Sequence, residues 1–597
     1  MAETVLDIVA AHRAGTVTPS QTVARTFARI RAHADPALFI TLRDEAEVLA
    51  EAKALEAAGN KNLPLYGVPF AVKDNIDVAG LPTTAACPAF SFNPAHDATS
   101  VARLRAAGAL VIGKTNLDQF ATGLVGVRSP YGVPRNTFDP ALVPGGSSSG
   151  SATAVAAGIV PFSLGTDTAG SGRVPAGFNS IVGLKPSLGL ISTHGLVPAC
   201  RTLDCISIFA LTVDDAWAAL SAASGYDAAD SYSRHRPLGH PGAMPPHLKL
   251  GVPIPGQRLF FGDQEYEAGY GRALERLAKL GCAIVEIDIE PFYETARLLY
   301  EGPWVAERAL TAKDLLASDP DAIHPVTREI TIGGLRPTAM DAFAAFYRLE
   351  RLRRVSDDIF ARQIDALALP TAPTHYSVAE VLADPITLNS RLGTYTNFVN
   401  LLDLCGLALP ASLTSKGMPF AVTLLAPGGH DARLASIGRV FHADTQLPLG
   451  ALNVPQPQLK PVANVATEGE IAVAVVGAHL SGLPLNGELK SLGGRLLEAT
   501  RTAPDYKLYA LNGTVPPKPG LLRVEGGKGA AIELEVWALP IEAFGRFMDG
   551  VAAPLSIGTL TLADGRTVKG FLVEAAAVSD ARDITKLGGW RKYLTNG

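Results

Sequence analysis

Charged residues are scarce in this sequence of 597 residues, since Asp, Glu, Lys and Arg together make up only 18% of it. Lys and Arg (52) nearly balance Asp and Glu (57), and no basic tract interleaved with aromatic residues occurs. Nucleic-acid binding requires a basic surface of that kind. The composition therefore does not support a nucleic-acid partner, and we expect a small-molecule substrate.

Cysteine is also rare. The five cysteines are odd in number and widely separated, and they contain no CxxC pair. This pattern indicates neither a disulfide framework nor a zinc site. We expect five buried free thiols, at Cys87, Cys200, Cys205, Cys282 and Cys405.

Long apolar runs and targeting signals are absent. The run IAVAVVGAHL at 471–480 is too short to span a bilayer, and residues 1–15 lack the basic start and apolar core of a signal peptide. We therefore expect a soluble cytoplasmic protein without a membrane partner.

Glycine (58) and proline (43) are abundant, which predicts a compact protein with many tight loops, and the length predicts two domains. After about 60 residues with helical patterns, short β-rich runs alternate with helices, as in an α/β domain with a mixed or parallel sheet. At 453–467 proline density rises and periodicity is lost, which is typical of a linker. We expect a large α/β domain at 1–452 and a small, mostly β or α+β domain at 468–597.

The stretch GGSSSGSATAVAAG (145–158) places a run of serines before a helix-forming segment. It lacks the lysine of a Walker-type phosphate loop. GSSSG fits GxSxG with Ser148 at its centre, but a nucleophile elbow follows a strand, and here a Pro/Gly-rich loop precedes it. A flexible linker does not fit, because the small apolar residues that follow favour a helix. The stretch is part of a site or a tightly packed turn.

Two further segments carry polar residues in unusual surroundings. GTDTAGSGRVPAG (165–177) embeds Ser171 among small residues, where several backbone N–H groups can face one point, as an oxyanion hole requires. Lys73 lies in the apolar run GVPFAVKDNIDV. From that run alone, a surface lysine at a strand end is the simpler interpretation.

Together, GVPFAVKDN, PGGSSSGSATAVAAG and GTDTAGSGRVPA resemble the amidase signature family in content, order and the 24-residue separation of Ser147 and Ser171. DALALPTAPT, LLDLCGLALPAS and GMPFAVTLLAP are also similar to late family segments, so the resemblance covers roughly residues 1–450. It implies a central mixed β-sheet surrounded by helices. It also implies a Ser-cisSer-Lys triad of Ser171 (nucleophile), Ser147 (bridge) and Lys73 (base), with no cofactor and no metal.

The same resemblance assigns the oxyanion hole to the backbone N–H groups of Thr168, Ala169, Gly170 and Ser171. A lysine base must be neutral when it accepts a proton. Lowering its pKa from about 10.4 to about 7–8 corresponds to roughly 3–4 kcal/mol, which burial and nearby amide dipoles can supply.

Ala169 and Gly172 depart from the common family string, which carries glycine and a bulky apolar residue there. We expect Gly172 to leave room beside the nucleophile. With a C-terminal extension, this variant looks like the allophanate hydrolase branch. That likeness implies hydrolysis of allophanate (urea-1-carboxylate) to ammonia and carbon dioxide through an acyl-enzyme, with N-carboxycarbamate as intermediate.

A small anionic substrate needs a fixed cation and a second donor. Tyr300 and Arg308, in LLYEGPWVAERAL, resemble the carboxylate-binding pair of this branch. Their spacing of eight is compatible with one helical face, although an ordinary helix with a solvated arginine has the same spacing.

The C-terminal region resembles a γ-glutamyl cyclotransferase-like α+β domain, and His479 is its candidate residue for assisting decarboxylation of N-carboxycarbamate. A lone histidine at a strand end is more often structural. The branch suggests a homodimer. Because no biotin-attachment or ATP-grasp-like segment occurs, allophanate would come from a separate biotin-dependent urea carboxylase.

Two alternatives remain open at this point. In the first, the chain is an amidase or amidotransferase subunit whose substrate is a neutral amide. Such a substrate would give a buried Arg308 no purpose. In the second, the chain is a noncatalytic binding protein with the same fold. The presence of all three triad residues argues against this second alternative.

Overall fold

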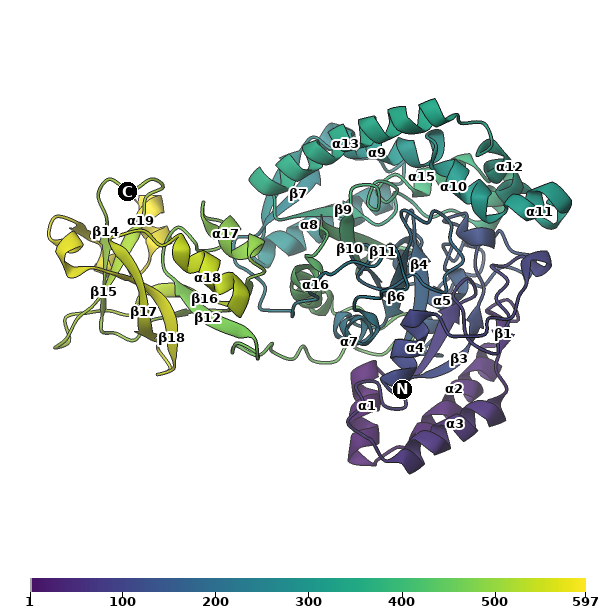
Figure 1. Cartoon of the computed structure of the whole chain (residues 1–597), viewed down its shortest axis with the longest axis horizontal. Helices are drawn as coiled ribbons and strands as arrows, with labels where there is room; N and C mark the ends of the chain where they lie inside the picture. Colours follow the sequence, from purple (N-terminus) through teal and green to yellow (C-terminus); the bar gives the residue numbers. More distant parts are fainter. Residues whose placement is uncertain (1–2, 597) are drawn as a thin grey trace. The chain divides into compact units, whose positions relative to one another are not determined.

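A mixed eleven-stranded β-sheet forms the centre of the larger of two compact units in the computed structural model, which describes residues 3–596 (Figure 1). Strand β2 runs parallel to β3 and β4, whereas β4, β6, β5, β10, β11 and β9 pair in antiparallel fashion. The predicted α/β architecture with a central mixed sheet is confirmed. In sheet order the strands are β1 (Phe39–Leu42), β3 (Leu110–Thr115), β2 (Pro69–Lys73), β4 (Phe162–Asp167), β6 (Cys205–Ala210), β5 (Val182–Lys185), β10 (Leu404–Leu413), β11 (Pro419–Pro427), β9 (Ala366–Pro370), β7 (Lys249–Pro253) and β8 (Ala283–Ile287).

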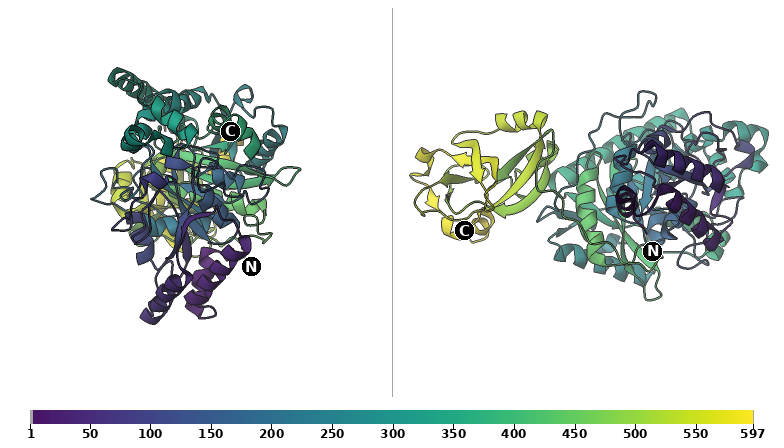
Figure 2. Two further views of the ribbon diagram at one scale, coloured as in Figure 1. Left: turned by 90° about the vertical axis from the view of Figure 1, so that its right-hand side faces the viewer. Right: turned by 90° about the horizontal axis from the view of Figure 1, so that it is seen from below.

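Helices surround this sheet, and the N-terminal ones lie at its periphery (Figures 1 and 2). Local signals explain several of their ends: Thr18 caps α2 with Pro19 at its first position, and Gly59 ends α3 in a left-handed conformation. The helices of this unit are α1 (Val5–Ala14), α2 (Pro19–His33), α3 (Glu45–Ala58), α4 (Thr99–Ala106), α5 (Ser149–Ala156), α6 (Val174–Phe178), α7 (Val213–Ala223), α8 (Gln264–Lys279), α9 (Glu290–Glu301), α10 (Trp304–Thr311), α11 (Lys313–Ser318), α12 (Pro325–Gly333), α13 (Ala339–Arg362), α14 (Val378–Ala383), α15 (Thr387–Leu392) and α16 (Asp431–Thr445).

Helix α5 packs directly on the strands that carry polar residues at their ends. It contacts β2, β3, β4 and β6, and all eight of its residues are buried. Small side chains permit this close approach, and a Cβ at Gly150 would lie 2.5 Å from the carbonyl oxygen of Leu38. Because β2 and β4 are parallel, their C-terminal residues, Lys73 and Asp167, lie at the same edge of the sheet.

The smaller unit has its own hydrophobic core and two sheets, with strand orders β13-β16-β12-β18-β17 and β15-β14-β19. Of the described residues, it contains 459–596 together with the short segments 239–249 and 281–283. The last passage of the chain from the larger to the smaller unit follows Gln458, within the proline-rich stretch. The elements are β12 (Glu470–Val475), α17 (Asn486–Ser491), β13 (Arg495–Arg501), β14 (Tyr506–Ala510), β15 (Pro519–Arg523), β16 (Glu533–Pro540), α18 (Ile541–Asp549), β17 (Leu555–Thr561), β18 (Thr567–Val573), β19 (Arg582–Asp583) and α19 (Trp590–Asn596).

All five cysteines are buried and free, as expected. Burial also raises the pKa of Cys200 and of Cys205 to about 12. From residue 3 to residue 596, every helix is too short or too polar to pass through a bilayer.

Candidate active site

Lys73, the last residue of β2, is fully buried. Its Nζ lies 2.7 Å from Ser147 Oγ and 2.7 Å from Thr166 Oγ1. Burial lowers the pKa of this amine to about 7, although nearby carboxylates, that of Asp118 first, oppose the shift. The interpretation of Lys73 as a surface lysine is therefore wrong, and a large fraction of it is neutral at neutral pH.

Ser147 lies in the turn before α5, and the peptide bond between Gly146 and Ser147 is cis. Its Oγ lies 2.9 Å from Ser171 Oγ, so Lys73, Ser147 and Ser171 form one continuous chain of hydrogen-bonding groups. Ser148 does not join this chain, because its hydroxyl donates to the main-chain carbonyl of Thr166.

Ser171 lies in the glycine-rich turn between β4 and α6. Among residues 3–596, the backbone N–H groups of Thr168, Ala169, Gly170 and Ser171 donate to no protein acceptor. Gly170 has a φ of +153°, and a Cβ there would lie 2.5 Å from Thr396 Oγ1. Four unused donors in one turn beside a serine hydroxyl form a candidate oxyanion hole.

A buried ion pair joins two residues that flank this turn, Asp167 and Arg173. The Arg173 guanidinium donates to both carboxylate oxygens of Asp167, at 2.8 and 2.9 Å. Burial alone would raise the pKa of Asp167, but the charge and hydrogen bonds of Arg173 outweigh it and lower that pKa. The expectation of open room beside Gly172 is wrong, because a Cβ there would lie 2.5 Å from the Cβ of Ser207.

Tyr300 and Arg308 lie on two helices rather than on one helical face. Tyr300 is in the last turn of α9 and Arg308 is in α10, and the break between the helices falls at Gly302 and Pro303. Proline disfavours a helical conformation at the residue before it, which ends α9 there. The two side chains nevertheless meet, since Arg308 donates to the Tyr300 hydroxyl at 3.2 Å.

The Arg308 guanidinium is buried and donates only to uncharged oxygens. Besides Tyr300, its acceptors are Thr122 Oγ1 at 3.0 Å and the Ala121 carbonyl at 3.4 Å, and its Nε has no partner among residues 3–596. Residues 121–123 also contact the candidate nucleophile, because Ser171 Oγ donates to the Gly123 carbonyl at 3.5 Å. A buried cation without a carboxylate partner is the arrangement expected where an anionic ligand binds.

The sequence matches two known protein-family profiles. The amidase family profile matches residues 21–435. The chain belongs to the amidase family. A second profile, that of the allophanate hydrolase C-terminal domain, matches residues 471–595.

Several relatives extend the likeness beyond the amidase region. Urea amidolyase of Lachancea kluyveri is 44% identical over 577 residues, covering 94% of this chain and 31% of that protein. The chain thus spans about a third of the length of such curated relatives. The structure of Kluyveromyces lactis allophanate hydrolase matches 99% of both chains with 41% identity and a TM-score of 0.78. One subunit of the glutamyl-tRNA(Gln) amidotransferase of Thermosynechococcus vestitus is 36% identical over 69% of this chain and 92% of its own length.

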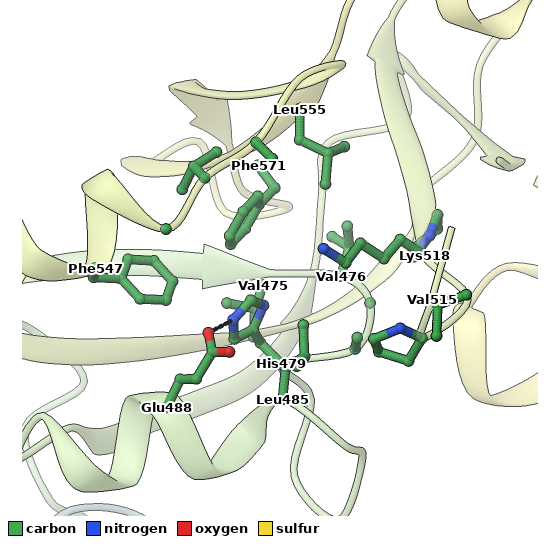
Figure 3. A pocket seen from close by; sticks show the side chains of 17 residues that line it. Val475, Val476, His479, Leu485, Glu488, Val515, Lys518, Phe547, Leu555 and Phe571 are labelled. Atoms are coloured by element: carbon green, nitrogen blue, oxygen red, sulfur yellow. Dashed lines mark hydrogen bonds and ion pairs between the residues drawn. The ribbon is translucent and has the colours of Figure 1, made fainter. Parts of the chain in front are cut away.

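The smaller unit of this amidase-family protein contains a cavity of about 150 Å³ (Figure 3). His479 lines it, with Nε2 2.8 Å from Glu488 Oε2 and its ring stacked on Phe571 at a centroid distance of 5.2 Å. The Lys518 side chain extends into the cavity (Figure 3). Burial lowers the pKa of His479, although Glu488 opposes this shift.

Sequence reasoning missed several residues of the larger site. Thr166 contacts Lys73, and the carbonyl of Gly123 faces Ser171, yet neither carries a chemical signal of its own in the sequence. Thr166 could have been noticed as a polar residue near the end of an apolar run, two residues before the glycine-rich turn. Gly123 takes part through its main chain, which a side-chain pattern does not reveal.

Proposed function

We propose that this protein hydrolyses allophanate to ammonia and carbon dioxide. The observation that carries the proposal is the buried Arg308 guanidinium, which donates to no carboxylate among the described residues. It contacts Ala121 and Thr122, and the next residue, Gly123, contacts Ser171. The amidase-family triad geometry and the likeness to allophanate hydrolase of K. lactis support it.

The first chemical step is acylation of Ser171. Ser171 Oγ attacks the carboxamide carbon while its proton passes through Ser147 to neutral Lys73, a route for which hydroxyl rotation suffices. The backbone N–H groups of Thr168, Ala169, Gly170 and Ser171 stabilise the oxyanion, and donors of this kind are worth about 10²–10³ in rate each. Ammonia leaves with a proton returned from Lys73.

Water then attacks the acyl-enzyme and releases N-carboxycarbamate. The substrate's own carboxylate accepts hydrogen bonds from Arg308 and Tyr300 throughout, which fixes the carboxamide over Ser171. Allophanate and water thus give N-carboxycarbamate and ammonium.

We further propose that His479 assists the loss of carbon dioxide. N-carboxycarbamate takes up one proton as it splits into carbamate and carbon dioxide, and carbamate then decomposes. A cavity with a histidine oriented by Glu488 and with the cationic Lys518 suits a small dianion that must gain a proton. In this proposal residues 1–452 form the amidase domain, 453–467 the linker and 468–597 the second domain.

Ammonia release from allophanate is the direct test, measured with the wild type, Ser171→Ala and Arg308→Ala. We expect Ser171→Ala to abolish release and Arg308→Ala to lower kcat/KM by about 10²–10³, while a small neutral amide loses little with Arg308→Ala. If allophanate is inert and a neutral amide is hydrolysed, the substrate assignment is wrong and the alternative of a neutral-amide amidase or amidotransferase subunit is correct.

Two further proposals concern partners. The biotin-dependent carboxylation of urea would take place outside these 597 residues, and two copies of this chain would form a homodimer. Light scattering of the purified protein at several concentrations measures the second directly.

A further inference from the structure

Asp204 is a buried carboxylate that contacts the turn of the candidate oxyanion hole, residues 168–171. No motif in the sequence points to it. It lies directly before β6 and accepts three hydrogen bonds. Its Oδ1 accepts from the Thr168 hydroxyl at 2.5 Å and from the Cys200 amide at 3.2 Å, and its Oδ2 accepts from the Ala199 amide at 2.8 Å. Burial raises its pKa, and these hydrogen bonds oppose that shift.

The segment closed by these bonds, residues 198–204, also contacts helix α10. Thr202 Oγ1 donates to Glu307 Oε2 at 2.8 Å, and Thr311 Oγ1 donates to the Pro198 carbonyl at 2.9 Å. The Cys200 thiol lies 3.5 Å from the carbonyl of Trp304. Helix α10 carries Arg308, so one short segment connects the turn that begins at Thr168 with the helix of the proposed carboxylate site.

The proposed substrate, allophanate, makes the distance between the 168–171 turn and helix α10 important. In allophanate a single nitrogen joins the carboxylate to the carboxamide, so the distance between the anion-binding group and the oxyanion hole has almost no freedom. Oxyanion donors must lie about 2.7–3.1 Å from the oxyanion, and small misplacements reduce the rate strongly. A longer, flexible substrate could adapt to a shifted turn, whereas this one cannot.

We propose that Asp204 is a positioning residue that fixes the Thr168–Ser171 turn and, through segment 198–204, holds it at the correct distance from Arg308. It does not touch the substrate. It acts by keeping the Thr168 side chain, and with it the backbone N–H groups of the turn, in one orientation. The link to Arg308 rests on the proposed function, but the link to the turn does not.

Four variants separate these links. Asp204→Asn keeps the shape but turns one acceptor into a donor, Thr168→Val removes the hydroxyl and keeps the backbone N–H, and Thr168→Ser restores the hydroxyl. Asp431→Asn is the matched control, because the buried Asp431 likewise accepts from a hydroxyl and a backbone N–H, both of Ser187.

The first measurement needs no substrate. Ser171 displaces fluoride from a small alkyl phosphonofluoridate, whose phosphoryl oxygen occupies the oxyanion hole, and intact-protein mass spectrometry follows the labelling rate. We expect Asp204→Asn and Thr168→Val to slow labelling by about tenfold to a hundredfold, with no further loss in the double variant. Thr168→Ser, which restores the hydroxyl, should label faster than Thr168→Val, and Asp431→Asn should label at nearly the wild-type rate. Unchanged labelling in Asp204→Asn would overturn the proposal.

The second measurement compares kcat for allophanate and for a small neutral amide. We expect Asp204→Asn to lower kcat for allophanate at least about tenfold more than kcat for the neutral amide, with little change in KM. Equal losses would overturn the link to Arg308 and leave the link to the turn. If wild-type protein does not hydrolyse allophanate while labelling still depends on Asp204, the proposed function fails and the positioning of the turn stands.

Discussion

The proposed chemistry depends on a lysine that burial keeps partly neutral. Within the described part of the chain, the groups at hydrogen-bond distance from Lys73 are both hydroxyls, those of Ser147 and Thr166. A carboxylate in direct contact would hold the proton on the amine and prevent it from acting as a base. The carboxylate of Asp167, close by in sequence to the nucleophile, is instead engaged by Arg173.

The pH dependence of kcat/KM should therefore have an acidic limb near pH 7. Lys73 carries a proton below its pKa of about 7 and loses it above, and only the neutral form accepts a proton from Ser147. Activity should fall about tenfold per pH unit well below pH 7. Initial rates of ammonia release between pH 5 and pH 9 measure this limb, and Lys73→Ala should lower kcat by about 10²–10⁴. A profile that is flat from pH 5 to pH 9 would contradict the assignment of Lys73 as the base.

At the scale of elements, the candidate active site of the larger unit is built from glycine-rich turns. Because glycine has no side chain, the backbone of these turns packs closely against neighbouring groups. A Cβ at Gly146 would lie 2.1 Å from Asp118 Oδ2 and 2.5 Å from the Gly126 amide nitrogen. The Asp118 carboxylate in turn accepts from the backbone N–H groups of Gly126 and Arg128. The turn that carries Ser147 therefore has no space for any other residue at position 146.

Gly146→Ala should abolish most activity and destabilise the protein, since the clash with Asp118 displaces Ser147 from its position between Lys73 and Ser171. Gly271→Ala is the matched control. Gly271 is exposed in α8, and a Cβ there meets no atom within 4 Å. That variant should keep full activity and gain about 0.5–1 kcal/mol in unfolding free energy. Thermal unfolding and kcat of both variants check this, and wild-type activity in Gly146→Ala would show that the turn tolerates a side chain.

At the scale of the whole molecule, the two units have separate cores and separate cavities or sites. The groups of the proposed triad come from β2, from the turn before α5 and from the turn after β4, whereas His479 follows β12 in the smaller unit. A division of the proposed reaction into two successive steps fits this separation, because N-carboxycarbamate formed with the first ammonia is the compound that then loses carbon dioxide.

His479→Ala should therefore leave the first ammonia release unchanged and slow carbon dioxide release. Glu488→Gln should have a smaller effect in the same direction, because it weakens only the orientation of the imidazole. The exposed His96 provides a control, and His96→Ala should change neither rate. Parallel time courses of ammonia and carbon dioxide at saturating allophanate measure the two steps. Equal rates of carbon dioxide release in wild type and His479→Ala would rule out a role for this histidine.

Much of the fold and part of the site follow from the sequence, for physical reasons that differ by residue. Alternating helical and β-rich runs predict the α/β class, and the resemblance of the glycine-serine strings to the amidase signature singles out Ser147 and Ser171. The tight turns that carry these strings tolerate few other residues. The break between Tyr300 and Arg308 could not be seen from their spacing, although Pro303 is its cause. Thr166 and Asp204 enter the site only through strand pairing between distant segments, which spacing along the chain does not encode.

The glycine- and serine-rich string 145–158 lies inside the protein. Except for the half-buried Ala157, each of its residues is shielded from solvent. An antibody raised against a synthetic peptide of this sequence should therefore bind the heat-denatured chain and not the native enzyme. Blots of native and heated protein measure the difference. The same string that supplies Ser147 can thereby serve as an immunological reporter of unfolding.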